Sequence, residues 1–72
     1  MDKNKLLGVI ASAGETCSDA ANVIGVTRVT FSKKINEKDG ASFTQPEILA
    51  IKNHYNLNAE QVDLIFFASK VS

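Results

Sequence analysis

The sequence predicts an all-α protein, a compact bundle of five helices with a helix-turn-helix at its centre. Apolar residues recur at helical spacing in five segments of the chain. A residue that typically caps a helix stands in front of four of those segments. Only four glycines and one proline interrupt the 72 residues, which favours helices over many short strands. Because the chain shows no repeat, linker or low-complexity tract, residues 1–72 are predicted to form a single domain.

The first predicted helix lies near the N-terminus, where Leu6, Val9 and Ile10 fall on one face. Gly14 is expected to follow its last turn, because glycine readily adopts the left-handed conformation that ends many helices. Gly8 lies inside this helix and weakens it by about 1 kcal/mol relative to alanine. We expect another backbone to approach closely at Gly8 as compensation.

The second predicted helix begins at Thr16, and Asp19 three residues later completes a variant of the capping box. Its apolar side consists of Ala20, Ala21, Val23 and Ile24. Gly25 is expected to form the following turn, since glycine adopts a positive φ without steric strain. Val26 is expected to turn inward.

The third predicted helix is capped by Thr27, with Phe31 and Ile35 one turn apart on its inward side. The residues left facing outward are mostly basic or hydroxylated: Thr27, Arg28, Thr30, Ser32, Lys33 and Lys34. Residues 27–38 carry four of the eight basic residues and one of the eight acids. The segment therefore has a local charge of +3, although the whole chain has a formal net charge of zero.

Two further helices are predicted after a loop at residues 38–42. Thr44 is the expected cap of the fourth helix, with proline in the first turn and Glu47 reaching back to the cap. Its apolar side is formed by Ile48, Leu49, Ile51 and Tyr55. Asn58 and Gln61 repeat the device before the fifth helix, whose apolar residues are Val62, Leu64, Ile65, Phe66 and Phe67. Adjacent phenylalanines cannot both face one core, so Phe67 is expected to cover the base of the first helix or a neighbouring subunit.

Catalytic and metal chemistry find no support in the sequence. His54 is the only histidine and Cys17 the only cysteine, so they cannot form a zinc ligand set. No glycine-rich phosphate loop or nucleophile elbow is present. We therefore predict no enzyme activity, cofactor, metal or small-molecule ligand. His54 is interpreted as a surface residue, Cys17 as a half-buried small hydrophobe, and Tyr55 with Phe66 as core.

Cysteine usage and hydropathy bear on the compartment. A single cysteine cannot form an internal disulfide and suits a reducing environment. The chain has no basic-then-apolar leader, and no apolar run approaches the roughly 18 residues of a membrane span. We expect a cytoplasmic protein that does not act at a membrane.

Three segments together resemble a known family. They are AANVIGVTRVTFSKKIN (20–36), FTQPEI (43–48) and IFF (65–67). In these segments the chain is similar to helix-turn-helix phage regulators of the Cro and lambda-repressor type. More narrowly, it resembles small Cro-like proteins from phages of Gram-positive bacteria. The resemblance covers about residues 6 to 67. It implies the lambda-repressor-like DNA-binding fold and a role in the switch between lysogeny and lytic growth, opposing a resident repressor.

The resemblance also assigns roles to the third helix. In a recognition helix the N-terminal residues face base edges in the major groove, here Thr27, Arg28, Val29 and Thr30, with Lys33 one turn further. A bidentate contact of Arg28 with guanine is worth about 1 to 3 kcal/mol of discrimination. Lys33, Lys34 and Lys38, together with the amide end of the second helix near Thr16 and Cys17, would contact phosphates.

Other features favour a protein partner. Family members often have glutamine at the position of Cys17, which is a poorer hydrogen-bonding residue. An apolar patch of Val26, Val29 and Cys17, rimmed by Arg28, Asp19 and Lys33, resembles a mixed protein interface. Glu15 and Asp19 would repel a duplex, but they would complement a basic DNA-reading protein.

Two functions are therefore considered, with the first preferred. The protein is predicted to be an anti-repressor, or modulator, that binds the phage repressor at its DNA-binding domain and alters the repressor's operator binding. Operator DNA, bound by this protein alone or together with the repressor, is a further candidate partner. The alternative is a Cro-like repressor that binds operator DNA directly through residues 27–36, as a dimer. Two other interpretations remain. Arg28, Lys33 and Lys34 could be ordinary solvated surface residues. The whole protein could be an adaptor or a toxin-neutralising module unrelated to phage.

Overall fold

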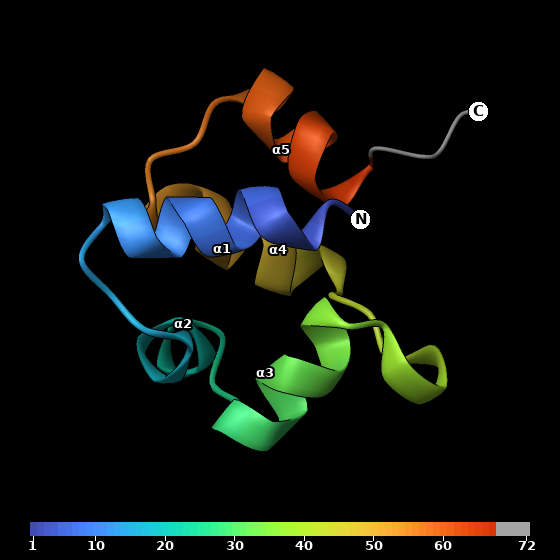
Figure 1. The fold of residues 1–72 in the computed structure, drawn as a ribbon. Helices are drawn as coiled ribbons and strands as arrows, with labels where there is room; N and C mark the ends of the chain where they lie inside the picture. Colours follow the sequence, from blue (N-terminus) through green and yellow to red (C-terminus); the bar gives the residue numbers. More distant parts are fainter. Residues whose placement is uncertain (68–72) are drawn as a thin grey trace.

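A computed structural model describes residues 1–67, which form five α-helices and one short 3-10 turn and include no strand (Figure 1). The helices are α1 (Lys3–Ser12), α2 (Cys17–Val23), α3 (Arg28–Ile35), α4 (Gln45–His54) and α5 (Ala59–Phe66), and the 3-10 turn η1 is Lys38–Gly40. The predicted all-α bundle of five helices is confirmed.

The helices begin where side chains satisfy their first backbone N–H groups. In α2 the Thr16 hydroxyl accepts a hydrogen bond from the Asp19 N–H at 3.3 Å, and the Asp19 carboxylate accepts one from the Thr16 N–H at 2.8 Å. The same reciprocal capping box starts α4 at Thr44 and α5 at Asn58. Because each box fixes two otherwise unpaired N–H groups, these starts follow from local sequence alone.

The core consists of apolar side chains from all five helices and the segments between them. Its buried members are Leu6, Ile10, Ala20, Ala21, Phe31, Ile35, Ile48, Ile51, Leu57, Val62 and Ile65. Phe31 on α3 meets Phe43 edge to face, and Phe43 meets Phe66 of α5 in the same way, each pair with ring centroids 5.6 Å apart. Such pairs contribute beyond their buried area. This aromatic row fixes the inward side of α3.

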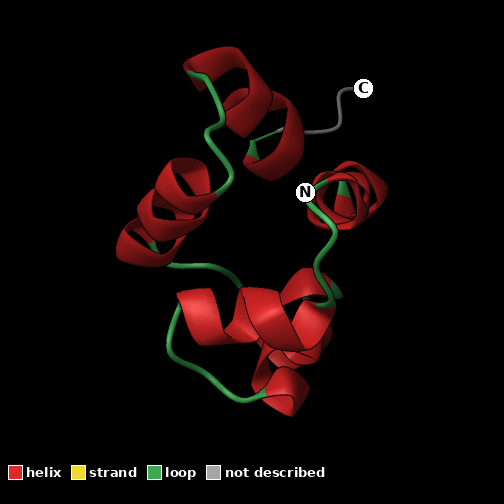
Figure 2. Ribbon diagram, turned by 90° about the vertical axis from the view of Figure 1, so that its left-hand side faces the viewer, coloured by secondary structure: helices red, strands yellow, loops and turns green. Residues whose placement is uncertain are grey.

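The arrangement leaves α3 at one end of the molecule. Figures 1 and 2 show α2 and α3 together at that end, α5 at the opposite end, and α1 and α4 between them. The inward side of α3 is covered by the core, and its opposite side faces solvent. The fold therefore presents one helix of eight residues as an accessible face.

Three expectations about side chains and backbone require correction. A Cβ built on Gly8 would meet nothing within 4 Å, so the predicted close backbone approach is wrong, and α1 carries the intrinsic penalty of this glycine. Leu49, assigned to the apolar side of α4, is 55% exposed, and Leu64 of α5 is also exposed. By contrast, the positive φ of Gly14 and Gly25 is as predicted.

The two adjacent phenylalanines at the end of α5 have different environments. Phe66 is half-buried and packs on Phe43, while Phe67 is exposed on the surface. This agrees with the prediction that both rings cannot face one core. Phe67 borders a shallow groove between α4 and α5, next to Leu49.

Candidate functional site on the outer face of helix α3

A tight turn after α2 sets the direction of α3. Gly25 adopts φ 75°, which L-residues with a Cβ rarely reach, and the Val26 N–H then donates to the Ala21 carbonyl at 3.0 Å. The Thr27 hydroxyl accepts from the Thr30 N–H at 3.2 Å and caps α3. Half-buried Val26 packs against the core, as predicted. These contacts hold α3 against α2.

The outer face of α3 has an apolar centre. Val29 is 67% exposed, the highest value among the large hydrophobic residues described. Arg28, Ser32 and Lys33 are exposed around it, whereas Thr30 is half-buried and its hydroxyl accepts a hydrogen bond from Thr27 at 3.1 Å. We call the exposed residues Arg28, Val29, Ser32 and Lys33 the α3 face.

Lys34 does not belong to this face, although the sequence suggested it as a phosphate contact. Its Nζ lies 3.1 Å from the Glu47 carboxylate and donates to the Ser42 carbonyl at 3.1 Å. The Lys34 side chain is only 15% exposed, because the ion pair is held between α3 and the start of α4. Lys34 is therefore a structural residue. Lys38 is exposed in η1, beyond the end of α3.

Glu47 is a carboxylate with two competing influences on its pKa. Partial burial raises the pKa, while the hydrogen bond from the Thr44 N–H and the contact with Lys34 lower it. The lowering influences prevail, so the pKa of Glu47 lies below its ordinary value. Glu47 thus stays ionised at neutral pH and keeps its pairing with Lys34.

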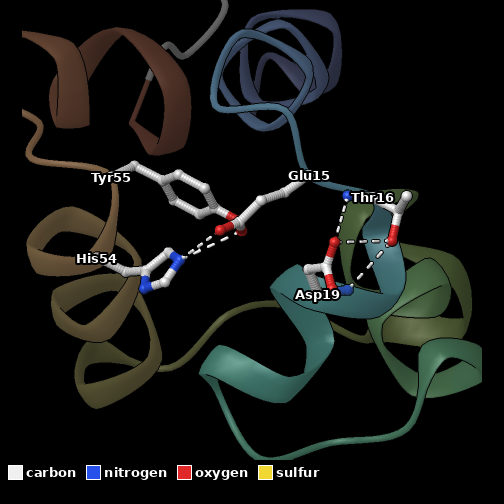
Figure 3. Close-up of polar contacts among 5 residues, drawn as sticks. All are labelled: Glu15, Thr16, Asp19, His54 and Tyr55. Carbon is white, nitrogen blue, oxygen red and sulfur yellow. Dashed lines mark hydrogen bonds and ion pairs between the residues drawn. The ribbon is translucent and has the colours of Figure 1, made fainter.

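Glu15, which the sequence placed at a partner interface, makes hydrogen bonds within the molecule. The Tyr55 hydroxyl donates to Glu15 Oε1 at 2.8 Å, and His54 Nε2 lies 3.0 Å from Oε2 (Figure 3). The carboxylate thereby joins the α1–α2 connection to the end of α4. His54 is exposed, as its interpretation as a surface residue predicted, and its ring also pairs with Glu15. Asp19 is exposed, and its carboxylate caps α2 through Thr16 (Figure 3).

The contacts around Glu15 move two pKa values in opposite directions. Hydrogen bonds with His54 and Tyr55 lower the pKa of Glu15, because both stabilise the ionised carboxylate. Burial and the hydrogen bond to Glu15 raise the pKa of Tyr55, because both favour its neutral form. At neutral pH the pair is an anionic acceptor and a neutral donor.

We expect Glu15→Gln to destabilise the protein at pH 7 and to have little effect in acid. The lowered pKa of Glu15 means that its stabilising contribution is complete above the unfolded-state value of 4.5 and is lost as pH falls through the lower folded-state value. Urea unfolding of both proteins at pH 7, 5.5 and below about 3.5 checks this. Glu60→Gln, a change at an exposed carboxylate of α5, is the matched control. A stability difference between wild type and Glu15→Gln that persisted unchanged in acid would contradict the assignment.

A small hollow of about 160 Å³ adjoins the α3 face. Its polar lining comes from Lys3 of α1 and from Arg28, Ser32 and Asn36 of α3 and its cap. Lys3 Nζ donates to the Asn36 side-chain oxygen at 2.8 Å, which places a cation from the chain's start beside α3. The sequence did not suggest Lys3, because 33 residues separate it from Asn36.

Leu7, Cys17 and Ile35 complete the lining of this hollow. Cys17 is half-buried, as predicted for a small hydrophobic residue. It lines the hollow together with the cationic Lys3 and Arg28. Of the predicted apolar patch, Val26 and Cys17 are half-buried and Val29 alone is well exposed. The accessible apolar surface is therefore narrower than predicted and centred on Val29.

The chain was compared with known proteins, and no family model, curated protein or solved structure matches it. Within residues 1–67, no three histidine, cysteine, aspartate or glutamate side chains gather where they could hold a metal ion. None of the helices in that range has the length and apolarity to cross a membrane.

Proposed function

We propose that this protein is a phage transcriptional regulator of the lysogeny/lytic switch that acts as an anti-repressor, or modulator, in the host cytoplasm. In this proposal α2 and α3 form a helix-turn-helix whose α3 face binds the DNA-binding domain of the phage repressor and changes its operator binding. The resemblance of residues 20–36 to Cro-like regulators supports the biological setting. The exposure of Val29 is the observation that carries the choice of a protein partner.

An apolar side chain at the centre of a polar rim is typical of a protein interface. Interfaces bury apolar residues at their core and keep charged residues at the edge. Val29 is 67% exposed, and Arg28 and Lys33 flank it on α3. A valine in the major groove contacts only thymine methyl groups and contributes no hydrogen bond. The α3 face thus resembles the centre of a protein interface more than a base-reading surface.

The charge inventory points the same way. The chain has a formal net charge of zero, and the pairing of Lys34 with Glu47 removes one of the four cations of residues 27–38. Arg28, Lys33 and Lys38 then remain for phosphate contact. DNA-binding proteins commonly neutralise about 6 to 10 phosphates. Tight DNA binding by a single protomer therefore has little electrostatic support, and a dimer with about six such cations would only reach the lower end of that range.

One observation favours the second candidate, a Cro-like repressor that binds operator DNA as a dimer through α3. Arg28 lies at the first position of α3, where a recognition helix meets bases, and no hydrogen bond or ion pair engages it within residues 1–67. Lys3 of α1 lines the same hollow as Arg28 and adds a further cation beside α3. A joint complex with the repressor on DNA would also use these cations.

Two titrations distinguish the candidates. Fluorescence anisotropy of a labelled generic duplex is measured at low and physiological salt, and the same protein is titrated with the purified repressor encoded beside its gene. We expect the repressor to bind and the duplex not to bind at physiological salt. Micromolar duplex binding that weakens steeply with salt, without repressor binding, would support the Cro-like function instead. Absence of a neighbouring repressor gene would favour an adaptor or toxin-neutralising module.

A further inference from the structure

We infer that the hollow beside α3 is the seat of a single carboxylate side chain, a glutamate or aspartate, presented by the protein partner. The inference rests on the proposed function and names the chemistry by which the partner is recognised. Its basis is a cationic lining that the molecule itself does not neutralise, together with apolar lining residues and a volume that suits one side chain.

The polar side of the hollow is arranged before any partner arrives. The Asn36 amide nitrogen donates to the Ser32 carbonyl at 2.9 Å, and its oxygen accepts from Lys3 Nζ at 2.8 Å. The contact with Asn36 places the Lys3 ammonium at the hollow and leaves two of its three N–H groups for another acceptor.

The positive charge of the hollow has no counter-charge in its lining. No acidic residue lines it, and the ion pairs described within residues 1–67 involve neither Lys3 nor Arg28. Arg28 offers five N–H donors in a planar fork that matches the two oxygens of a carboxylate. An anion is therefore the complementary ligand.

Size and lining distinguish a side chain from other anions. The volume of about 160 Å³ is well below the roughly 300 to 1,000 Å³ of small-molecule pockets. Leu7, Cys17 and Ile35 give the hollow an apolar side that suits the methylene groups of a glutamate, next to the cationic donors. On a helix, residues three apart are neighbours, so Ser32 connects the hollow with Val29. One partner surface can thus cover Val29 and place a carboxylate in the hollow.

The first test uses Cys17, the only cysteine, as a reporter inside the hollow. Its rate of reaction with dianionic dithiobis(nitrobenzoate) is divided by its rate with neutral dithiodipyridine. Because both reagents react with the same thiolate, a change in thiolate population cancels in the ratio. We expect this ratio to fall about tenfold in a Lys3→Gln, Arg28→Gln double variant and to approach the variant's value in wild type at about 1 M salt. Lys5→Gln, which removes the same charge from α1 outside the hollow, should leave the ratio unchanged. An equal ratio in wild type and the double variant overturns the inference.

The second test uses the repressor encoded beside the gene. Lys3→Gln and Arg28→Gln are each expected to weaken its binding about tenfold, while Lys5→Gln leaves it unchanged. Each Glu or Asp of the repressor is then changed to its amide. For one of these substitutions, the loss of binding free energy should not add to the loss caused by Arg28→Gln in a double-mutant cycle. Unchanged affinity in both hollow variants overturns the inference but leaves the proposed function standing.

Two other outcomes separate the inference from the proposed function. If wild type does not bind the repressor, the proposed function fails, and the reagent ratio then decides only whether the hollow attracts an anion. If a generic duplex binds, protects Cys17 from both reagents, and loses affinity in Lys3→Gln and Arg28→Gln, the hollow holds a phosphate of DNA. That result overturns the inference of a protein carboxylate.

Discussion

Phe31→Ala is expected to remove a large part of the protein's stability, about 3 to 5 kcal/mol of its free energy of unfolding. Phe31 has no exposed surface and joins α3 to the core through its edge-to-face contact with Phe43. Removing a buried phenylalanine ring costs about 3 to 5 kcal/mol, because apolar contacts are lost and a cavity is left. A domain of this length has a total stability of roughly 4 to 11 kcal/mol. The loss is therefore comparable with the stability of the whole protein.

Urea unfolding followed by circular dichroism at the helix band measures this effect. Phe31→Leu keeps most of the volume and is expected to lose only about 1.5 kcal/mol. Leu49→Ala removes a side chain that is 55% exposed and should change the free energy of unfolding by no more than about 0.5 kcal/mol. If Phe31→Ala unfolded at the same urea concentration as Leu49→Ala, the aromatic row would not be the anchor of α3.

The position of Phe31 also explains why Val29 faces outward. Successive residues turn by about 100° around a helix, so two residues two positions apart lie on roughly opposite sides. Burial of Phe31 against Phe43 thus directs Val29 to solvent, where its side chain is 67% exposed. The same packing that stabilises the fold presents the proposed binding surface.

The helix starts could be predicted from the sequence because their causes are local. The capping pairs that begin α2, α4 and α5 each span three residues, so the donor and acceptor are visible in one short stretch. The turn at Gly25 is similarly local, since only a positive φ at that residue is required. The inward positions Phe31 and Ile35 followed from helical spacing.

The contacts that define the candidate site could not be predicted in this way. Glu15 and His54 are 39 residues apart, and the pairings of Lys3 with Asn36 and of Lys34 with Glu47 also join different elements. Charge patterns in one sequence show which residues are ionised, but not which of them meet after folding. The sequence therefore predicted a phosphate contact for Lys34 and no role for Lys3. Similarly, the apolar character of Leu49 did not reveal that its side of α4 is left uncovered.

Val29→Lys is expected to change binding to the two candidate partners in opposite directions. At the apolar centre of a protein interface, an ammonium group loses its hydration without a partner, so affinity for the repressor should fall by about 2 kcal/mol or more, roughly 30-fold. On a DNA-binding surface the same lysine adds a cation, so affinity for a generic duplex should rise at low salt. The fold should tolerate the change, since Val29 is exposed and lysine favours helix at least as well as valine.

Anisotropy titrations with the repressor and with a labelled duplex, run on the same preparations, measure both directions. Val29→Ile keeps the apolar character of the site and should retain repressor binding within about threefold. Urea unfolding of Val29→Lys must match wild type within about 0.5 kcal/mol, which separates a binding defect from a folding defect. Repressor affinity that is equal in wild type and Val29→Lys would place the interface away from α3. The exposed valine would then be an ordinary surface residue, and Arg28 with Lys3 would favour the DNA-binding alternative.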